Sequence, residues 1–220
     1  MSAAMNGSAP TARAEMLSKV REAAGDQAIT REAEYSALPR EYREHGQSDR
    51  REVLNQFASR LHDYDAVVYH CDSQGIAQTV AAAMSARGKT SLLRPEQLPQ
   101  EWLPSELSFP PVDGLPYEEI DRGQGVITAC VAAIAFTGTI VLRHGVADGR
   151  RALTLIPDYH LCVVFADQVV ETVPEGFDRL RGMETLPLTT VSGPSATADI
   201  EMSRVKGVHG PRFLDVILVG

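Results

Sequence analysis

The end of the chain gathers the residue types that are best suited to bind a small polar ligand. Two stretches, 191–201 and 207–212, carry hydroxyl, acidic, imidazole and guanidinium groups between apolar runs at 186–191 and 213–219. The apolar runs have the length of buried strands, and a short helix is expected between the polar stretches. Because binding crevices of open α/β sheets lie at strand ends, this region predicts a site for a small anionic ligand or a partner's cofactor.

Further polar residues fall at or just after other predicted strands. Arginines there would hold a carboxylate or phosphate by paired hydrogen bonds, and hydroxyls with helix-start amides would complete an anion site. Histidines would transfer protons near neutral pH. The predicted ligand-binding residues are Thr137, Gly138, Thr139, Arg150, Arg151, Ser192, Gly193, Ser195, Thr197 and Arg212, and the catalytic candidates are His160, His209 and Asp199.

Most of these residues also have a purely structural interpretation. The alternatives are helix capping for Ser195, Thr197 and Asp199, a solvated loop for Arg150 and Arg151, and a hydrogen-bonded core position for His160. Packing gives no reason for His209, which lies between two glycines close to Pro211 and Arg212. The nucleophile motif G-x-S-x-G does not occur in the chain, so serine hydrolase chemistry has little support.

The elements that must position these residues read as one α/β domain, residues 48–220, after an N-terminal arm, residues 1–47, that is expected to be partly disordered. A helix that begins at Ser48 or Asp49 carries an apolar stripe on one face. A βαβ-like unit follows, with its strand, helix and second strand at residues 66–70, 74–87 and 90–93. Six or seven short strands that alternate with helices predict an open, mostly parallel sheet with flanking helices.

The uncharged stretch 125–142 is the one segment whose length approaches that of a membrane span. Threonines and a glycine interrupt it, so it is interpreted as buried α/β core with no membrane span. Strands are expected at 126–127 and 139–142, with a helical turn or bend at 129–135. Between 94 and 117, six prolines exclude a long helix or a central strand.

Composition excludes several classes of partner. The formal net charge of −8 over 220 residues argues against nonspecific binding to nucleic acid or to an anionic membrane. The N-terminus lacks the apolar segment of a secretory signal, so a cytoplasmic location is expected. The three cysteines form no C-x-x-C pair, so this chain is predicted to bind no iron–sulfur cluster, metal ion or other cofactor itself.

Four stretches together resemble, in order and spacing, the LUD domain, the family of the C subunit of bacterial lactate-utilization systems. They are residues 133–142, 151–160, 192–201 and 207–212, and the resemblance extends from 48 to 220. It implies a fold similar to the NagB/RpiA/CoA-transferase group. It also implies a role beside two iron–sulfur partner proteins that carry the clusters, in the oxidation of L-lactate to pyruvate. A small carboxylate is then the expected ligand.

One residue departs from the family pattern. The family commonly has an acidic residue where this chain has Phe136, directly before Thr137, so covalent carboxylate catalysis at that position is excluded. This departure favours a subunit over an independent enzyme. The alternative that stays open is a stand-alone enzyme for a small phosphorylated or CoA-linked carboxylic acid, which rests on fold analogy alone.

Overall fold

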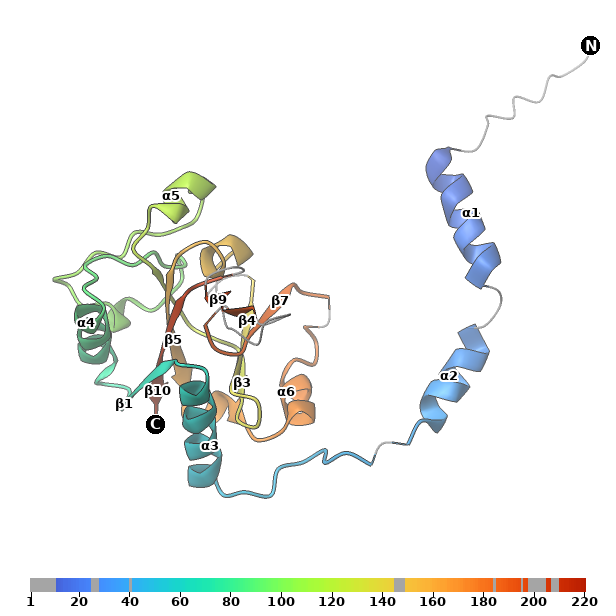
Figure 1. Ribbon diagram of the computed structural model, residues 1–220, viewed down its shortest axis with the longest axis horizontal. Coiled ribbons are helices and arrows are strands. Elements are labelled where there is room, and N and C mark those ends of the chain that lie inside the picture. The colour runs from blue at the N-terminus through green and yellow to red at the C-terminus, as the bar shows by residue number, and fades with distance from the viewer. Residues whose placement is uncertain are drawn as a thin grey trace, which may run out of the picture. The chain divides into compact units, whose positions relative to one another are not determined.

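The computed structural model describes residues 11–24, 28–39, 41–144, 149–183, 185–194, 196–197, 205–206 and 210–220. The chain divides into two compact units, residues 1–42 and 43–220. The described part of the first unit contains two helices, α1 (Ala12–Ala24) and α2 (Ala28–Ala37) (Figure 1). The first ten residues of the predicted arm lie outside the described residues.

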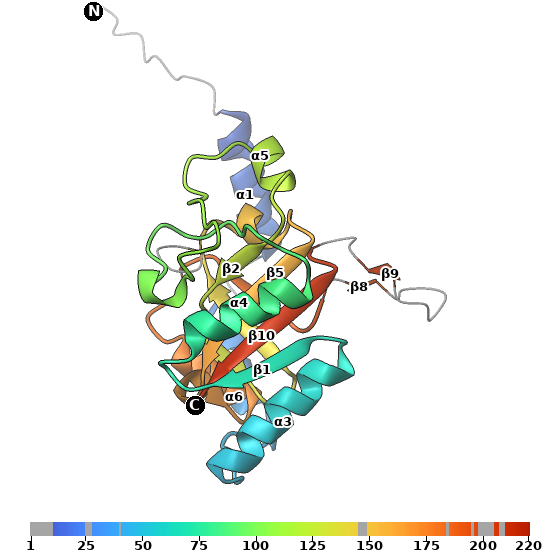
Figure 2. The ribbon, with the colours of Figure 1, turned by 90° about the vertical axis from the view of Figure 1, so that its left-hand side faces the viewer.

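The core of the second unit is a parallel sheet of four strands (Figure 2). Their order is β1 (Val67–Cys71), β10 (Phe213–Val219), β5 (Tyr159–Phe165) and β2 (Val126–Thr128). Both faces of the two central strands are buried, which is why β5 and β10 read as nearly continuous apolar runs. The expected parallel α/β core is therefore present.

The parallel sheet is covered on both faces. Helix α4 (Ile76–Ala86) packs on one face, and helix α3 (Arg50–Asp63) packs on the other together with a second sheet (Figure 1). Successive side chains of a strand point to opposite faces, so Leu161 of β5 joins the α4 side and Cys162 joins the α3 side. Asp49 caps α3 through a capping box with Glu52, as its position in the sequence predicts.

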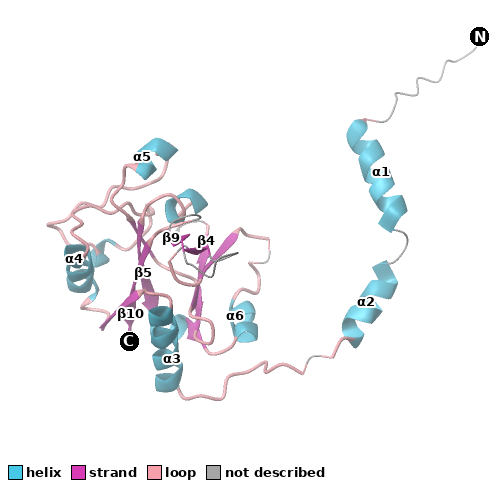
Figure 3. Cartoon of the chain, viewed as in Figure 1, coloured by secondary structure: helices cyan, strands magenta, loops and turns pink. Residues whose placement is uncertain are grey.

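The second sheet corrects the expectation of a single open sheet. It is mixed, in the order β6 (Val169–Val170), β3 (Ala132–Ile134), β4 (Thr139–Arg143) and β7 (Leu188–Val191). Figure 3 draws the strands in magenta and labels β4 of this sheet. The helical turn predicted at 129–135 is wrong, because β3 lies within it. A fully buried strand of small residues lacks the alternating pattern that distinguishes strand from helix.

The remaining elements of the unit are short. They are the helices α5 (Tyr117–Asp121) and α6 (Val173–Arg179) and the 3-10 turns η1 (Gln100–Trp102), η2 (Arg151–Thr154) and η3 (Ala166–Gln168). The strand predicted at 90–93 is reduced to isolated bridges, one of them between Leu93 and Val126. The proline-rich connection is fixed by Trp102, whose ring centroid lies 5.6 Å from that of Phe165.

Between β7 and β10, where a short helix was expected, the described residues 196–197 and 205–206 form paired strands, and the rest of the expected helix lies outside the described residues. Strands β8 (Ala196–Thr197) and β9 (Val205–Lys206) pair in antiparallel fashion. The interpretation of Thr197 as a helix cap is therefore wrong. Among the described residues no helix has both the length and the apolarity needed to cross a bilayer, and 125–142 supplies the core strands β2, β3 and β4.

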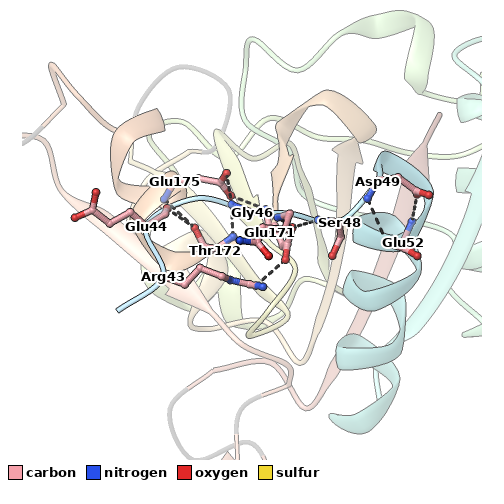
Figure 4. Close-up of polar contacts among 10 residues, drawn as sticks. Arg43, Glu44, Gly46, Ser48, Asp49, Glu52, Glu171, Thr172 and Glu175 are labelled. Atoms are coloured by element: carbon pink, nitrogen blue, oxygen red, sulfur yellow. Dashed lines mark hydrogen bonds and ion pairs between the residues drawn. The ribbon is translucent and has the colours of Figure 1, made fainter. Parts of the chain in front are cut away.

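A strap of six residues, 43–48, enters the domain along α6 (Figure 4). The buried carboxylate of Glu171 accepts hydrogen bonds from the backbone N–H groups of Gln47 and Ser48, both at 2.8 Å, and forms an ion pair with Arg43 at 2.6 Å. Glu175 accepts the N–H of Gly46 at 2.9 Å. A Cβ atom at Gly46 would lie 2.4 Å from Oε2 of Glu171, so this close approach requires glycine.

Candidate functional site

A cavity of about 250 Å³ lies between the rims of the two sheets. It is placed at the amino ends of β5 and β10 and the carboxyl end of β7, because His160 and Leu214 are the second residues of their strands. The crevice therefore does not lie at the carboxyl ends of the parallel strands. The described residues that line it are Thr154, Leu155, His160, Thr189, Thr190, Val191, Ser192, Gly193, Pro194, Gly210, Pro211 and Leu214.

Three predicted residues form a chain of hydroxyl groups at the wall of this cavity. The Oγ1 atoms of Thr137 and Thr139 are 2.7 Å apart, and Oγ1 of Thr139 is 2.7 Å from Oγ of Ser192. Thr139 begins β4, whereas Ser192 follows β7, and antiparallel pairing brings the two together. The chain thus links the 137–139 turn to Ser192, which lines the cavity.

Two predicted glycines allow this part of the fold to lie against α3. Gly138 and Gly193 have φ angles of +62° and +84°, which disfavour other residues. A Cβ atom would lie 2.7 Å from Cβ of Arg60 at the first position and 2.4 Å from Cβ of Tyr64 at the second. The two glycines therefore set how closely the hydroxyl-bearing turns approach the end of α3.

His160 is both a buried core residue and part of the cavity wall. Its side chain is almost wholly buried, and its Nε2 atom lies 2.8 Å from Oγ1 of Thr128. Oγ1 of Thr128 lies 3.7 Å from Sγ of Cys162. A hydrogen bond with Cys130, followed by those with His160 and Thr128, lowers the pKa of the Cys162 thiol to about 6 against the opposing effect of burial.

Predicted arginines 150 and 151 lie elsewhere. They line a separate cavity of about 590 Å³ with Asp113 and His144. The Arg150 guanidinium donates a hydrogen bond to the carbonyl oxygen of Leu115 and lies 5.6 Å from the centre of the Tyr117 ring. Among its described lining residues, the cavity at His160 carries no aspartate, glutamate, lysine or arginine.

Arg212 lies beside the His160 cavity but its charge is directed outward. It follows Pro211, which lines the cavity, and its guanidinium makes two hydrogen bonds to the carboxylate of Asp158. The hydrogen bond and charge of Arg212 lower the pKa of Asp158. Both side chains are about half exposed, so this ion pair forms an outer rim.

Several predicted residues lie outside the described residues, namely Ser195, Asp199 and His209, and of Thr197 only the backbone is described. Pro194 and Gly210, which flank 195–209 in the sequence, both line the cavity. The residues that sequence reasoning missed are Thr128, Thr154, Thr189, Thr190 and Cys162. Adjacent threonines in an apolar strand, before Ser192, were an available signal, whereas the pairing of Thr128 with Cys162 depends on strand register.

Comparison with known proteins identifies the family. The chain is 44% identical over 177 residues to a protein of Deinococcus radiodurans named lactate utilization protein C. The aligned residues make up 78% of this chain and 81% of that protein. The chain belongs to the LUD-domain family. The LUD-domain model matches residues 117–219, a range that contains every described residue lining the His160 cavity.

Two further comparisons extend this result. The crystal structure of a DUF162 family protein from Deinococcus radiodurans matches this LUD-domain protein with a TM-score of 0.69 and 39% identity, covering 79% of this chain and 100% of that chain. The lactate utilization protein C of Bacillus subtilis is 32% identical over 127 residues, which is 50% of this chain and 52% of that protein. The chain thus matches about half the length of the Bacillus relative.

Proposed function

We propose that this LUD-domain protein serves lactate utilization as a subunit of an L-lactate-oxidising complex with two iron–sulfur proteins. The observation that carries the proposal is the 44% identity to lactate utilization protein C over most of both chains. In this proposal the partners hold the clusters and pass on the electrons, because this sequence lacks the cysteine spacing of a cluster site. A cytoplasmic location and kinship with the NagB/RpiA/CoA-transferase fold belong to the same proposal.

The His160 cavity supports a small ligand. Its volume of about 250 Å³ falls below the roughly 300–1,000 Å³ of pockets for drug-sized molecules, which suits a three-carbon acid better than a CoA ester. The hydroxyls of Thr190 and Ser192 offer hydrogen bonds to a carboxylate, and His160 offers a group that can exchange a proton. The ion pair of Arg212 with Asp158 lies on the outer rim next to the opening.

The proposal is tested by producing the full chain together with the two candidate iron–sulfur proteins. We expect the three proteins to purify together and to reduce a dye when L-lactate is added. Leaving this chain out is expected to abolish the dye reduction. If the three proteins do not purify together and dye reduction continues without this chain, the proposal is wrong.

Variants in the same complex test the cavity. We expect His160→Gln and Ser192→Ala to lower lactate-dependent dye reduction at least tenfold while the complex still assembles. The matched control is Arg181→Ala, an exposed residue after the end of α6. Among the described residues its guanidinium pairs with Asp178 alone, and the variant is expected to leave activity unchanged. Full activity of both cavity variants would remove the cavity from the proposal.

The alternative function, a stand-alone enzyme, is tested by a simpler measurement on the purified chain. The purified chain is screened by thermal shift with sugar phosphates and CoA esters. A ligand at 100 times its dissociation constant adds about 2.7 kcal/mol of stability, which raises the unfolding temperature measurably. A clear shift with such a ligand, together with failure to purify with the iron–sulfur proteins, would replace the subunit proposal.

A further inference from the structure

His160 ends a chain of buried hydrogen bonds that crosses from β5 to β2 and back. Its Nε2 atom lies 2.8 Å from Oγ1 of Thr128, which lies 3.7 Å from Sγ of Cys162, which in turn lies 3.7 Å from the carbonyl oxygen of Ala129. The side chains of His160, Thr128 and Cys162 are all buried. Thr128 and Cys162 occupy facing positions of the paired strands, so strand register fixes the spacing.

The last acceptor in this series of hydrogen bonds indicates which group donates in each of them. The carbonyl oxygen of Ala129 can only accept; when the thiol of Cys162 donates to it, the sulfur is left to accept from the hydroxyl of Thr128. The lowered pKa of Cys162 acts in the same sense, because a thiolate can only accept. The single proton of Thr128 is then used, and its oxygen must accept a hydrogen bond from His160.

We infer that Thr128 and Cys162 hold neutral His160 as the tautomer with its proton on Nε2, so that the histidine of the cavity presents Nδ1 as a hydrogen-bond acceptor. Among the described residues, the hydrogen-bond partner found for the ring nitrogens is Thr128 at Nε2, and His160 lines the cavity. Thr128 and Cys162 are thus positioning residues that set which ring nitrogen keeps a free lone pair.

This tautomer determines the ligand class of the cavity. A ligand that faces Nδ1 must donate a hydrogen bond there, which the hydroxyl of a 2-hydroxy acid does and the carbonyl of a 2-keto acid does not. A site built to bond a hydroxyl rejects an analogue that lacks it, because its own polar group is then left unpaired. The identity of the ligand rests on the proposed function, whereas the tautomer does not.

The tautomer is measured by long-range proton–nitrogen NMR on the full chain labelled with ¹⁵N-histidine. The His160 signals are assigned by their loss in His160→Gln. In the neutral form we expect a protonated-type shift at Nε2 and an unprotonated-type shift at Nδ1. A protonated-type shift at Nδ1 in the wild-type chain would overturn the inference.

Two pairs of variants separate positioning from mere packing. Cys162→Ala frees the Thr128 hydroxyl to donate to Nε2, so the proton is expected to move to Nδ1 in most molecules, whereas Cys162→Ser keeps the acceptor and the wild-type tautomer. Thr128→Val is expected to give a mixture, and Thr128→Ser to restore the wild-type spectrum. A backbone amide spectrum checks that each variant is folded. Unchanged signals in both Cys162→Ala and Thr128→Val would overturn the positioning role.

The ligand class is tested by titrating the wild-type chain with L-lactate or pyruvate. We expect L-lactate to shift the Nδ1 signal and pyruvate to need at least a tenfold higher concentration for the same shift. A stronger response to pyruvate, or none to either acid, would overturn the ligand class. Because co-purification and dye reduction are measured separately, failure here is distinguishable from failure of the proposed function.

Discussion

At the scale of single residues, Asp215 is a fully buried charged residue in the central strand β10. Its buried carboxylate receives two hydrogen bonds from Arg87, at 2.5 and 3.1 Å, and one from the hydroxyl of Tyr159 at 3.0 Å. Arg87 also lies 4.9 Å from the centre of the Phe213 ring. Removing one partner of a buried ion pair leaves the other charge uncompensated, so this pair is structurally sensitive.

We therefore predict that Asp215→Ala lowers the free energy of unfolding by about 3–5 kcal/mol, because Arg87 loses its buried partner. The matched control is Asp158→Ala, which breaks the exposed ion pair with Arg212 and is expected to cost far less, because solvent screens exposed charges. Urea denaturation of both variants measures the two costs. Equal losses would contradict the distinction between the buried and the exposed pair.

A second comparison at this scale concerns glycines with positive φ. Gly193 and Gly182 have nearly the same φ, +84° and +83°. A Cβ atom at Gly193 would overlap Tyr64, whereas a Cβ atom at Gly182 would point into open space. Gly182→Ala is expected to cost about 1–2 kcal/mol from the backbone conformation alone. Gly193→Ala adds steric strain of about 1–3 kcal/mol. Thermal or urea unfolding that ranks the two variants the other way round would refute this account.

At the scale of elements, the strap 43–48 is held by the carboxylates of Glu171, directly after β6, and of Glu175 in α6. The backbone N–H of Ser48, together with further hydrogen bonds and the charge of Arg43, lowers the pKa of Glu171. An unfolded glutamate has a pKa of about 4.3. Because the folded pKa is lower, the stabilisation is complete above about pH 4.3 and is lost as pH falls through the folded pKa.

Glu171→Gln is therefore predicted to make unfolding less sensitive to acid. At pH 7 the variant is expected to lose about 1.5–3 kcal/mol, because hydrogen bonds to a charged acceptor are replaced by weaker ones. The difference from wild type is expected to shrink as pH falls below about 4.3. Urea denaturation at pH 7 and at lower pH measures it, and a difference that grows toward low pH would contradict the assignment.

Element types were predictable where a local signal exists. The capping residues Asp49 and Glu52 indicate the start of α3, and continuous apolar runs indicate the strands β5 and β10. Strand β3 was missed because buried small residues carry no period in the sequence. The pairing of β8 with β9 was missed because hydroxyl residues suit both helix caps and extended segments. Local pattern thus identified elements but not their partners in the sheets.

At the scale of the whole molecule, the site depends on pairings between distant segments. The sequence indicated that Thr139, His160 and Ser192 matter together, and the structure brings them to one rim. It also assigned Arg150 and Arg151 to the same site, but they line another cavity, since no local feature indicates which side of the fold a loop faces. Register between β2 and β5 likewise created the Thr128–Cys162 contact without a sequence signal.

The position of β10 has a consequence for biosynthesis. β10 lies between β1 and β5, and β1 pairs with no other described strand of the sheet. A ribosome therefore releases β1 long before its neighbour exists, and the sheet cannot close until residues 213–219 leave the exit tunnel. Such distant pairing makes folding slow, so the nascent chain must keep its apolar β1 and β5 from associating with other chains until translation reaches β10.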